Sequence, residues 1–366
     1  MSIDLPSRDT DVSGELGALY ESLARADLAP LWNITDQLLT PTPRPKAVPW
    51  LWSATTLRPL AERAIALVPI ERGGERRVLS LVNPGLGGRP YAAGTLWGAL
   101  QCLGPRESAP AHRHSPGAIR FVLSGAGVWT TVDGDACDMA PGDLVLTPAY
   151  NWHDHTNGGD EAMLWFDGLD LPVVEALDAV FFEEYGELQQ PHLRPHNRSE
   201  TEYGATGYRT VPDAVTEQLD PTPSPLLVYR WAQTDAELAR LAAETDSAKV
   251  TIEFTNPRSG ASVLPTLGCF MHRIAPNGSS LPERQAGNQV FVVFDGSGHS
   301  VIDGELFEWS AGDCFVVPSW APVEHHARER ADLFSISDAP VLRALGLFRR
   351  QTLDAAQPVL RVFQPR

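Results

Sequence analysis

Cysteine is scarce in this sequence and forms no recognisable motif. The four cysteines lie far apart and make no C-x-x-C pair; they are Cys102, Cys137, Cys269 and Cys314. A chain of 366 residues can bury a core of its own, so a disulfide framework is not expected. We therefore predict reduced, mostly buried thiols, and no structural zinc site built on cysteine.

Long apolar runs and a basic leader segment are also missing. The longest apolar stretches, such as residues 121–123 and 315–317, have only the length of strands, whereas a membrane-spanning helix needs about 20 apolar residues. Residues 1–5 are polar and lack the basic region that begins a signal peptide. These absences predict a cytoplasmic protein without a membrane partner.

Basic residues are outnumbered in this chain. There are 29 lysines and arginines against 46 aspartates and glutamates, which gives a net charge of −17. Such a balance argues against nucleic acids and anionic membranes as partners. An anionic substrate would have to be attracted by local positive charge, so an arginine close to a candidate site is of interest.

The N-terminal region, residues 1–75, is predicted to form a helical arm. Apolar residues recur at helical spacing within 14–27, a second helix is expected near 57–66, and prolines interrupt the segment 40–49 between them. We expect Trp32, Trp50 and Trp52 to be buried against a neighbouring domain or subunit.

From residue 77 the sequence changes to short apolar or alternating runs separated by Gly, Pro and Asp-Gly turns. This texture predicts an all-β-dominated barrel or sandwich over 76–185, closed by a helix at 173–185. A proline-rich linker follows at 186–248, with a helix near 235–244, before a second β-rich unit at 249–366. The expected strands of the first unit are 78–82, 96–103, 119–123, 128–132, 144–147 and 162–166.

The second β-rich unit repeats the first. Residues 123–127 (LSGAG) match 294–298 (FDGSG), and Asp133-Gly134 matches Asp303-Gly304. A Gly-Asp pair begins nine residues after that aspartate in both units, and Asp170 matches Asp338. Anchors at nearly constant spacing indicate two copies of one barrel.

Three histidines form the strongest candidate site. His112 and His114 are two residues apart, so on a strand their side chains point to the same face. His153 follows a G-D-x-x-x-x-P turn, and a neighbouring strand would bring it to the same place. Isolated histidines are more often surface or hydrogen-bonding residues, but this combination favours a metal ion with open coordination positions, as in catalytic sites.

The pattern resembles the cupin family, whose first motif contains H-x-H and a glutamate and whose second is G-D-x-x-x-x-P followed by a histidine. The glutamate is absent, because Ala118 and Ile119 stand at the matching positions, with Arg120 beside them. A site without this carboxylate keeps the full positive charge of its metal, and Arg120 adds another. Such a pocket suits an anion, for example an aromatic hydroxycarboxylate.

Five further stretches are similar to gentisate 1,2-dioxygenase and to relatives that cleave salicylate and 1-hydroxy-2-naphthoate. They are residues 47–52 (AVPWLW), 83–85 (NPG), 103–107 (LGPRE), 152–155 (WHDH) and 166–170 (FDGLD). The resemblance spans nearly the whole chain. It implies a bicupin fold of two double-stranded β-helix (jelly-roll) barrels, an Fe(II) cofactor and a homotetramer.

The resemblance also implies residue roles. His112, His114 and His153 match the iron ligands, Arg120 matches the arginine that pairs with the substrate carboxylate, and His155 is a candidate for proton transfer. The remaining residues expected at the substrate are Gln101, Asp167, Trp97 and Arg76, or Arg77 in place of Arg76. Ordinary core packing for Trp97 and a turn cap for Asp167 remain open.

The second barrel lacks the ligand pattern. Counting from the matching glycines, the histidine positions hold Glu283, Gln285 and Val323, although His325 still matches His155. We therefore expect one metal site per chain and a structural role for the second barrel. His299 and His326 are expected at the surface.

The resemblance implies ring opening of gentisate with O2, between the carboxyl-bearing and hydroxyl-bearing carbons, to give maleylpyruvate. Three alternatives stay open: the same chemistry on salicylate or 1-hydroxy-2-naphthoate, a non-catalytic ligand-binding bicupin, and a zinc- or manganese-dependent sugar isomerase. The isomerase would be expected to use the glutamate that is missing here.

Overall fold

The computed structural model describes residues 14–72, 77–205, 207–210 and 222–364. The chain divides into two compact units, Met1–Arg44 and Pro45–Arg366. The second unit holds both barrels and all of the predicted site residues. The fold is a mostly β bicupin, as the sequence predicts.

The first unit contains two short helices, α1 (Glu15–Arg25) and α2 (Leu31–Leu38), and neither contains a buried residue. The side chain of Trp32 is 62% exposed on these helices, so its burial against a neighbouring domain or subunit stays a prediction. The indole N–H of Trp32 donates to the hydroxyl of Tyr20 at 3.3 Å. Trp50 and Trp52, in contrast, pack against the main core.

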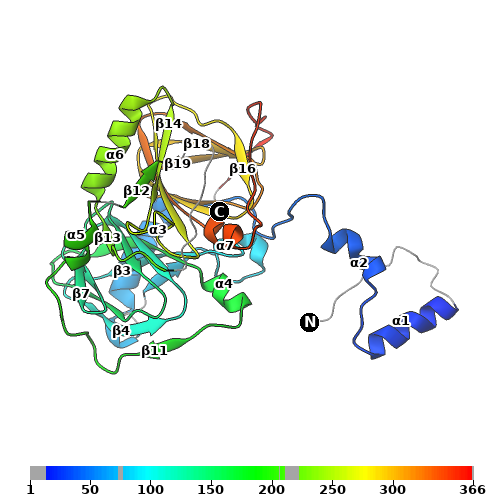
Figure 1. The fold of residues 1–366 in the computed structure, drawn as a ribbon, viewed down its shortest axis with the longest axis horizontal. Coiled ribbons are helices and arrows are strands. Elements are labelled where there is room, and N and C mark those ends of the chain that lie inside the picture. Colours follow the sequence, from blue (N-terminus) through cyan, green and yellow to red (C-terminus); the bar gives the residue numbers. More distant parts are fainter. Residues whose placement is uncertain (1–13, 73–76, 206, 211–221, 365–366) are drawn as a thin grey trace. The chain divides into compact units, whose positions relative to one another are not determined.

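The first barrel consists of two facing sheets with strand orders β13-β8-β5-β10-β3-β2 and β11-β4-β9-β6-β7. Figure 1 shows this barrel in cyan and green, below the second one. Its strands are β2 Val78–Ser80, β3 Trp97–Leu103, β4 Ser108–His114, β5 Ala118–Ser124, β6 Val128–Val132, β7 Asp135–Asp138, β8 Leu144–Thr147, β9 His153–Asn157, β10 Met163–Leu169, β11 Phe182–Glu184 and β13 Val228–Tyr229.

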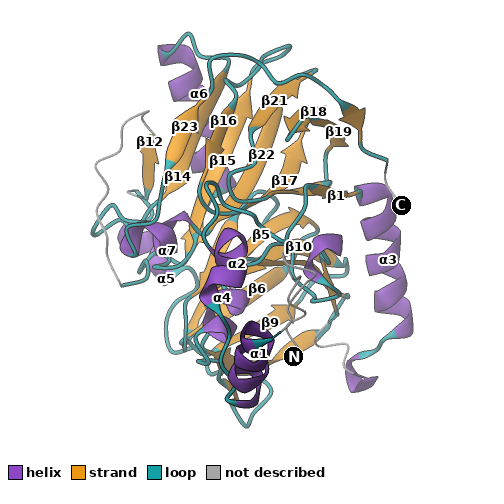
Figure 2. Cartoon of the chain, turned by 90° about the vertical axis from the view of Figure 1, so that its right-hand side faces the viewer, coloured by secondary structure: helices purple, strands orange, loops and turns teal. Residues whose placement is uncertain are grey.

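The second barrel has the same plan, with strand orders β1-β20-β17-β22-β15-β14-β12 and β23-β16-β21-β18-β19-β24. Figure 2 shows these two layers above the first barrel. Its strands are β1 Trp50–Trp52, β12 Tyr208–Thr210, β14 Lys249–Phe254, β15 Gly268–Ile274, β16 Glu283–Gln285, β17 Gln289–Asp295, β18 Ser297–Ile302, β19 Glu305–Ser310, β20 Cys314–Val317, β21 Val323–Ala327, β22 Ala331–Ser337, β23 Arg350–Thr352 and β24 Arg361–Val362.

The aspartates of the two matching Gly-Asp pairs have the same structural role in both barrels. Asp143 accepts the backbone N–H of Trp231 at 2.9 Å, and Asp313 accepts that of Ala54 at 2.7 Å. Each aspartate thereby satisfies an N–H group at the start of a helix, which otherwise lacks a partner. The helices of the second unit are α3 Ala54–Leu67, α4 Leu171–Ala176, α5 Arg198–Tyr203, α6 Trp231–Glu244 and α7 Ala339–Ala344, with 3-10 turns at Ile70–Arg72 and Pro84–Leu86.

The largest apolar cluster joins the two barrels. Phe121 of β5 and Phe334 of β22 stack with a ring-centroid distance of 4.2 Å and an angle of 1° between their planes. Phe254 and Phe166 also lie against Phe334, with ring centroids 6.2 and 6.5 Å away. Because apolar burial is the main stabilising contribution to folding, this shared core ties the barrels to one another.

Two sequence-based expectations need correction. The helix predicted at 173–185 is wrong beyond Ala176, because Asp178 adopts a left-handed conformation (φ 54°) and residues 182–184 form strand β11. Strand β7 was not among the predicted runs, and β4 and β9 were expected only from the histidine pattern, because their polar side chains hide the usual alternation. All four cysteines are free and buried, as expected. Among the described residues, no helix is long and apolar enough to cross a membrane.

Candidate active site

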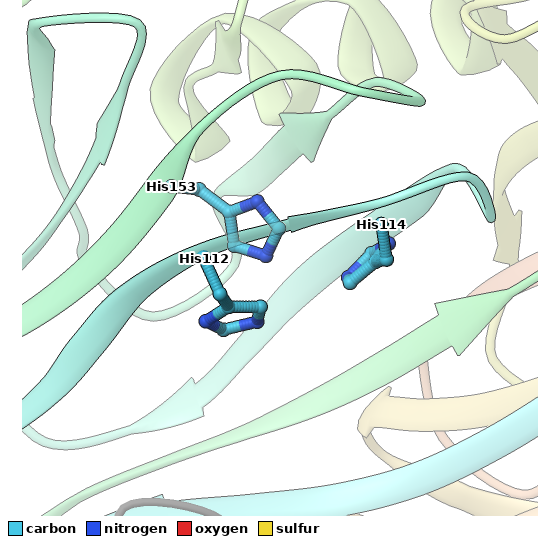
Figure 3. A group of neighbouring side chains, drawn as sticks. All are labelled: His112, His114 and His153. Atoms are coloured by element: carbon cyan, nitrogen blue, oxygen red, sulfur yellow. The ribbon is translucent and has the colours of Figure 1, made fainter. Parts of the chain in front are cut away.

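His112, His114 and His153 converge inside the first barrel (Figure 3). His112 and His114 lie on β4, and His153 at the start of β9 is the direct cross-strand partner of His112. One potential ligand atom from each residue lies within 4.8 Å of the others, and the ring centroids are 4.4 to 5.7 Å apart. The structure therefore brings together the three residues that the sequence predicted.

Backbone carbonyl groups orient all three imidazoles in the same way. The Nδ1 atoms of His112, His114 and His153 lie 2.8, 2.7 and 3.0 Å from the carbonyl oxygens of Pro110, Pro116 and Asn151. A carbonyl can only accept, so each Nδ1 carries the proton and each Nε2 keeps its lone pair. This is the tautomer that a metal ligand requires.

Burial keeps two of these imidazoles, those of His114 and His153, neutral. The pKa of His114 is lowered to about 4, first by loss of solvation and then by repulsion from His112. The pKa of His153 is lowered well below its usual value by burial, with Arg120 as the next cause. At neutral pH His114 and His153 therefore offer unprotonated nitrogen ligands.

The donor set fits a transition-metal ion. The Nε2 atom of His153 is buried and has no hydrogen-bond partner among the described residues, and an unsatisfied buried polar atom calls for a ligand. The cluster has three imidazoles and neither a thiolate nor a carboxylate, a composition that suits iron, copper, nickel or zinc. Three protein ligands leave room for further ligands at the metal.

Arg120 adds a positive charge to the same interior. Its guanidinium is buried, donates from Nη1 to Thr147 Oγ1 at 2.6 Å, and has its Nε atom unpartnered among the described residues. Asp167 lies 3.6 Å from that Nε atom, beyond hydrogen-bonding distance, and accepts the indole N–H of Trp165 at 3.0 Å. Burial raises the pKa of Asp167 to about 6, although Arg120 opposes this shift. The Nε–H of Arg120 is therefore left without a hydrogen-bond acceptor among the described residues.

His155 occupies the next inward position of β9. It is 1% exposed, and its Nδ1 atom lies 2.8 Å from the Thr130 hydroxyl. That hydroxyl also lies 3.1 Å from the sulfur of Met139, to which it can donate. His155 Nδ1–H then donates to Thr130, and its Nε2 atom keeps a lone pair.

The other predicted substrate residues are placed less directly. Trp97 and Gln101 are on the same face of β3 as Leu103, which packs in the core of the first barrel, and Gln101 is buried. Arg76 lies outside the described residues. Arg77 is buried with its guanidinium against Glu107 and donates to the carbonyl oxygen of Ile65 at 3.1 Å.

Sequence reasoning missed the strand that borders the metal ligands. In β11, Phe182 is paired with His114 and Glu184 with His112. The ring of Phe182 also stacks on that of His112, with centroids 5.3 Å apart. The run of apolar β-formers at 180–182 directly after Asp178 was the available signal.

The second barrel repeats the framework without the ligands. Glu283 lies opposite Val323, as His112 lies opposite His153. His325 Nδ1 lies 2.8 Å from Ser300 Oγ, which repeats the pair of His155 and Thr130. Across the described ranges, the first barrel supplies the single potential metal cluster. His299 and His326 face each other on β18 and β21, with ring centroids 4.6 Å apart.

Comparisons with known proteins agree with this geometry. The cupin domain family matches residues 99–169 and 270–336, one stretch in each barrel. Gentisate 1,2-dioxygenase from Streptomyces sp. is 46% identical over 344 residues, which cover 91% of this chain and 94% of that one. The chain belongs to the gentisate 1,2-dioxygenase family. It is a gentisate 1,2-dioxygenase-like ring-cleaving dioxygenase.

Other members of the family cover nearly the whole chain as well. A 5-aminosalicylate 1,2-dioxygenase from Comamonas sp. is 37% identical, over 94% of this chain and 92% of that one. The crystal structure of salicylate 1,2-dioxygenase from Pseudoaminobacter salicylatoxidans with gentisate has 40% sequence identity and a TM-score of 0.86, and the match covers 95% of this chain and 97% of that one. Membership of this family sets aside the non-catalytic bicupin and the sugar isomerase.

Proposed function

We propose that this protein is an Fe(II)-dependent gentisate 1,2-dioxygenase, which opens the ring between the carboxyl-bearing and hydroxyl-bearing carbons to give maleylpyruvate. The observation that supports it is a three-histidine cluster, in which His114 and His153 are neutral, beside a buried Arg120 whose Nε atom has no hydrogen-bond partner among the described residues. A metal-chelating aromatic acid with an ortho-hydroxyl matches both features. The 46% identity to a gentisate 1,2-dioxygenase supports the same substrate.

His112, His114 and His153 would hold the iron, which when bound would mediate electron transfer between the electron-rich ring and O2. Arg120 would bind the substrate carboxylate through its free Nε–H and fix the orientation of the ring. Gln101, Asp167, Trp97 and Arg76 complete the proposed substrate pocket. Since binding holds the ring in one geometry, the reaction no longer depends on random encounter.

His155 would accept the proton of the substrate hydroxyl. Its Nε2 lone pair can accept that proton, while Thr130 fixes the ring through Nδ1. Burial and Arg120 hold the pKa of His155 well below its usual value, so its imidazole is neutral at neutral pH. Both atoms of O2 end in the ring-opened acid, so no separate reductant is needed.

Anaerobic reconstitution with Fe(II), followed by O2-uptake measurements with gentisate, tests the proposal. We expect one O2 consumed per gentisate, and both atoms of labelled O2 in the product. Protein reconstituted with Zn(II) is the control and should consume none. Failure of the iron-loaded protein to consume O2 with gentisate, salicylate or 1-hydroxy-2-naphthoate would refute the dioxygenase assignment.

The metal content tests the assignment of the second barrel. With one histidine cluster in the described residues, we expect about one iron per chain. A value near two would show that the second barrel also binds metal.

A second candidate keeps the chemistry and changes the acid to salicylate or 1-hydroxy-2-naphthoate. It is favoured by structural similarity to salicylate 1,2-dioxygenase and by 33% identity to a 1-hydroxy-2-naphthoate 1,2-dioxygenase from Nocardioides sp.. Side-by-side kcat/KM values decide between the acids. Gentisate should be preferred, since its second hydroxyl makes the ring easier to oxidise.

The proposal extends to organisation and assembly. We propose the domain bounds 1–75, 76–185, 186–248 and 249–366, which limited proteolysis would test. We also propose a homotetramer in the cytoplasm. Light scattering should then give four chain masses, and a single chain mass would contradict the assembly.

A further inference from the structure

The second barrel encloses a cavity of about 570 Å³. Its lining includes Glu283 and Gln285, which stand where the first barrel has His112 and His114. The cavity is therefore the counterpart of the metal site, and its size lies in the range of small-molecule sites. Residues at other corresponding positions also differ between the two barrels.

Strand register identifies the replacements. In the first barrel Gln101 lies between Val78 and Trp165, and in the second His272 lies between Thr251 and Leu333. His272 thus replaces Gln101. By the same register Phe291 of β17 replaces Arg120, because it pairs with Ser335 as Arg120 pairs with Asp167.

The first barrel has its buried cation, Arg120, on β5, whereas the second barrel has a cation on β14. Lys249, at the start of β14, lines the cavity with a side chain that is 14% exposed, and its ammonium nitrogen lies 4.0 Å from Glu283. That distance is too long for a hydrogen bond. The same carboxylate accepts a hydrogen bond of 2.7 Å from Arg350 Nε. One carboxylate therefore faces two cations, in a chain whose net charge is −17.

The rest of the wall is fixed and suited to a small organic ligand. His272 is held from both nitrogens, by Thr251 at 2.9 Å and Ser335 at 2.8 Å. Burial and the charge of Lys249 lower the pKa of His272, so its imidazole is neutral and adds no charge to the cavity. Phe270 and Phe348 provide apolar surface on the same cavity.

We propose that the second barrel binds a small organic carboxylate, with Lys249 as its main charged partner. The residues of this position do not form a histidine metal site, since Glu283, Gln285 and Val323 replace the histidines. Duplication would thus have produced a metal site in one barrel and an anion site in the other. Two sources share this chemistry, an aromatic acid like the substrate and a ring-opened acid like the product.

Calorimetry on the full-length, iron-loaded protein under anaerobic conditions tests this proposal. Benzoate represents the aromatic acid and maleate the ring-opened acid, while benzamide is the neutral control with the shape of benzoate. An Arg120→Ala background removes the carboxylate partner of the first barrel. In that background we expect benzoate or maleate to bind, benzamide not to bind, and the tighter acid to identify the source.

Two variants then locate the binding. Lys249→Met should weaken the acid by about tenfold or more, since a hydrogen bond to a charged group contributes about 1.5–3 kcal/mol. Thr352→Asp, on the exposed strand β23 at the cavity wall, should weaken it by repulsion without disturbing the core. Each variant is first checked for wild-type thermal stability and iron content.

The proposal fails if neither acid binds in the Arg120→Ala background, or if benzamide binds as tightly as benzoate. It also fails if Lys249→Met and Thr352→Asp both leave the affinity unchanged. Because the readout is binding of acids that lack the ortho-hydroxyl, these results do not depend on which ring the first barrel opens. Failure here and failure of the proposed reaction are therefore distinguishable.

Discussion

Asp170 accepts a hydrogen bond from the hydroxyl of Thr266, a residue of the loop before β15 in the other barrel. It also accepts the backbone N–H of Gly117 at 2.8 Å. The relationship is reciprocal, because Asp338 accepts from Thr95, which lies next to the first barrel, and from the N–H of Asn288 at 2.8 Å. In each barrel, the aspartate that follows the last long strand thus accepts a hydrogen bond from a threonine of the other half of the chain.

The pH dependence of stability should report on Asp170. Burial raises its pKa to about 6 from an ordinary value of 3.8, despite the two hydrogen bonds. A carboxyl with a raised pKa stabilises the fold below its unfolded pKa, and this contribution is lost as the pH rises through 6. Between pH 5 and 7.5 the loss amounts to about 1.4 kcal/mol, since roughly one proton is displaced over one pH unit.

Asp170→Asn removes that titration. Chemical denaturation of both proteins at pH 5 and pH 7.5 should show the wild type losing stability relative to the variant as the pH rises. A constant difference between the two proteins would mean that Asp170 is not shifted.

Metal binding and substrate binding should separate between two variants. His153→Ala removes a ligand, so iron content after reconstitution should fall to near zero. Arg120→Ala should keep its iron and raise KM for gentisate by about tenfold to a hundredfold, the value of a charge-assisted hydrogen bond. Metal analysis and steady-state kinetics measure both. Equal iron loss in the two variants would contradict the roles.

Phe182→Ala tests the strand that the sequence did not reveal. Removing a ring that stacks on His112 frees this imidazole to rotate, so iron should dissociate about tenfold faster into a chelator. Phe181→Ala is the matched control, because Phe181 contacts Tyr150 and not the cluster. Similar dissociation rates for Phe182→Ala and the wild type would show that β11 does not support the site.

Phe334→Ala should destabilise the whole protein. The ring is fully buried and stacks on Phe121 between the barrels, and truncation of such a residue costs about 3–5 kcal/mol. Phe334→Leu keeps most of the volume and should cost clearly less. Denaturation curves measure both, and a single cooperative transition is expected because the barrels share this core. Two separate transitions would indicate barrels that unfold independently.

The sequence alone determined the duplication, the bicupin class and the three histidines. These features are encoded locally, since glycine turns such as those at Gly125 and Gly296 (φ 99° and 85°) require glycine, and H-x-H on a strand has a fixed geometry. The loss of ligands in the second barrel followed from counting residues between such turns.

Tertiary structure decided what depends on partners distant in the sequence. Strands β4 and β9 lack an apolar alternation because their inner faces bear histidines, so the sequence suggested them through the histidine spacing, and pairing with neighbours fixed their bounds. Residues 182–184 became a strand because β4 offered an unpaired edge, which a helical pattern could not indicate. The buried, unpartnered Nε of Arg120 and the cation-lined cavity of the second barrel likewise arise from long-range packing, which places charges from separate strands in one interior.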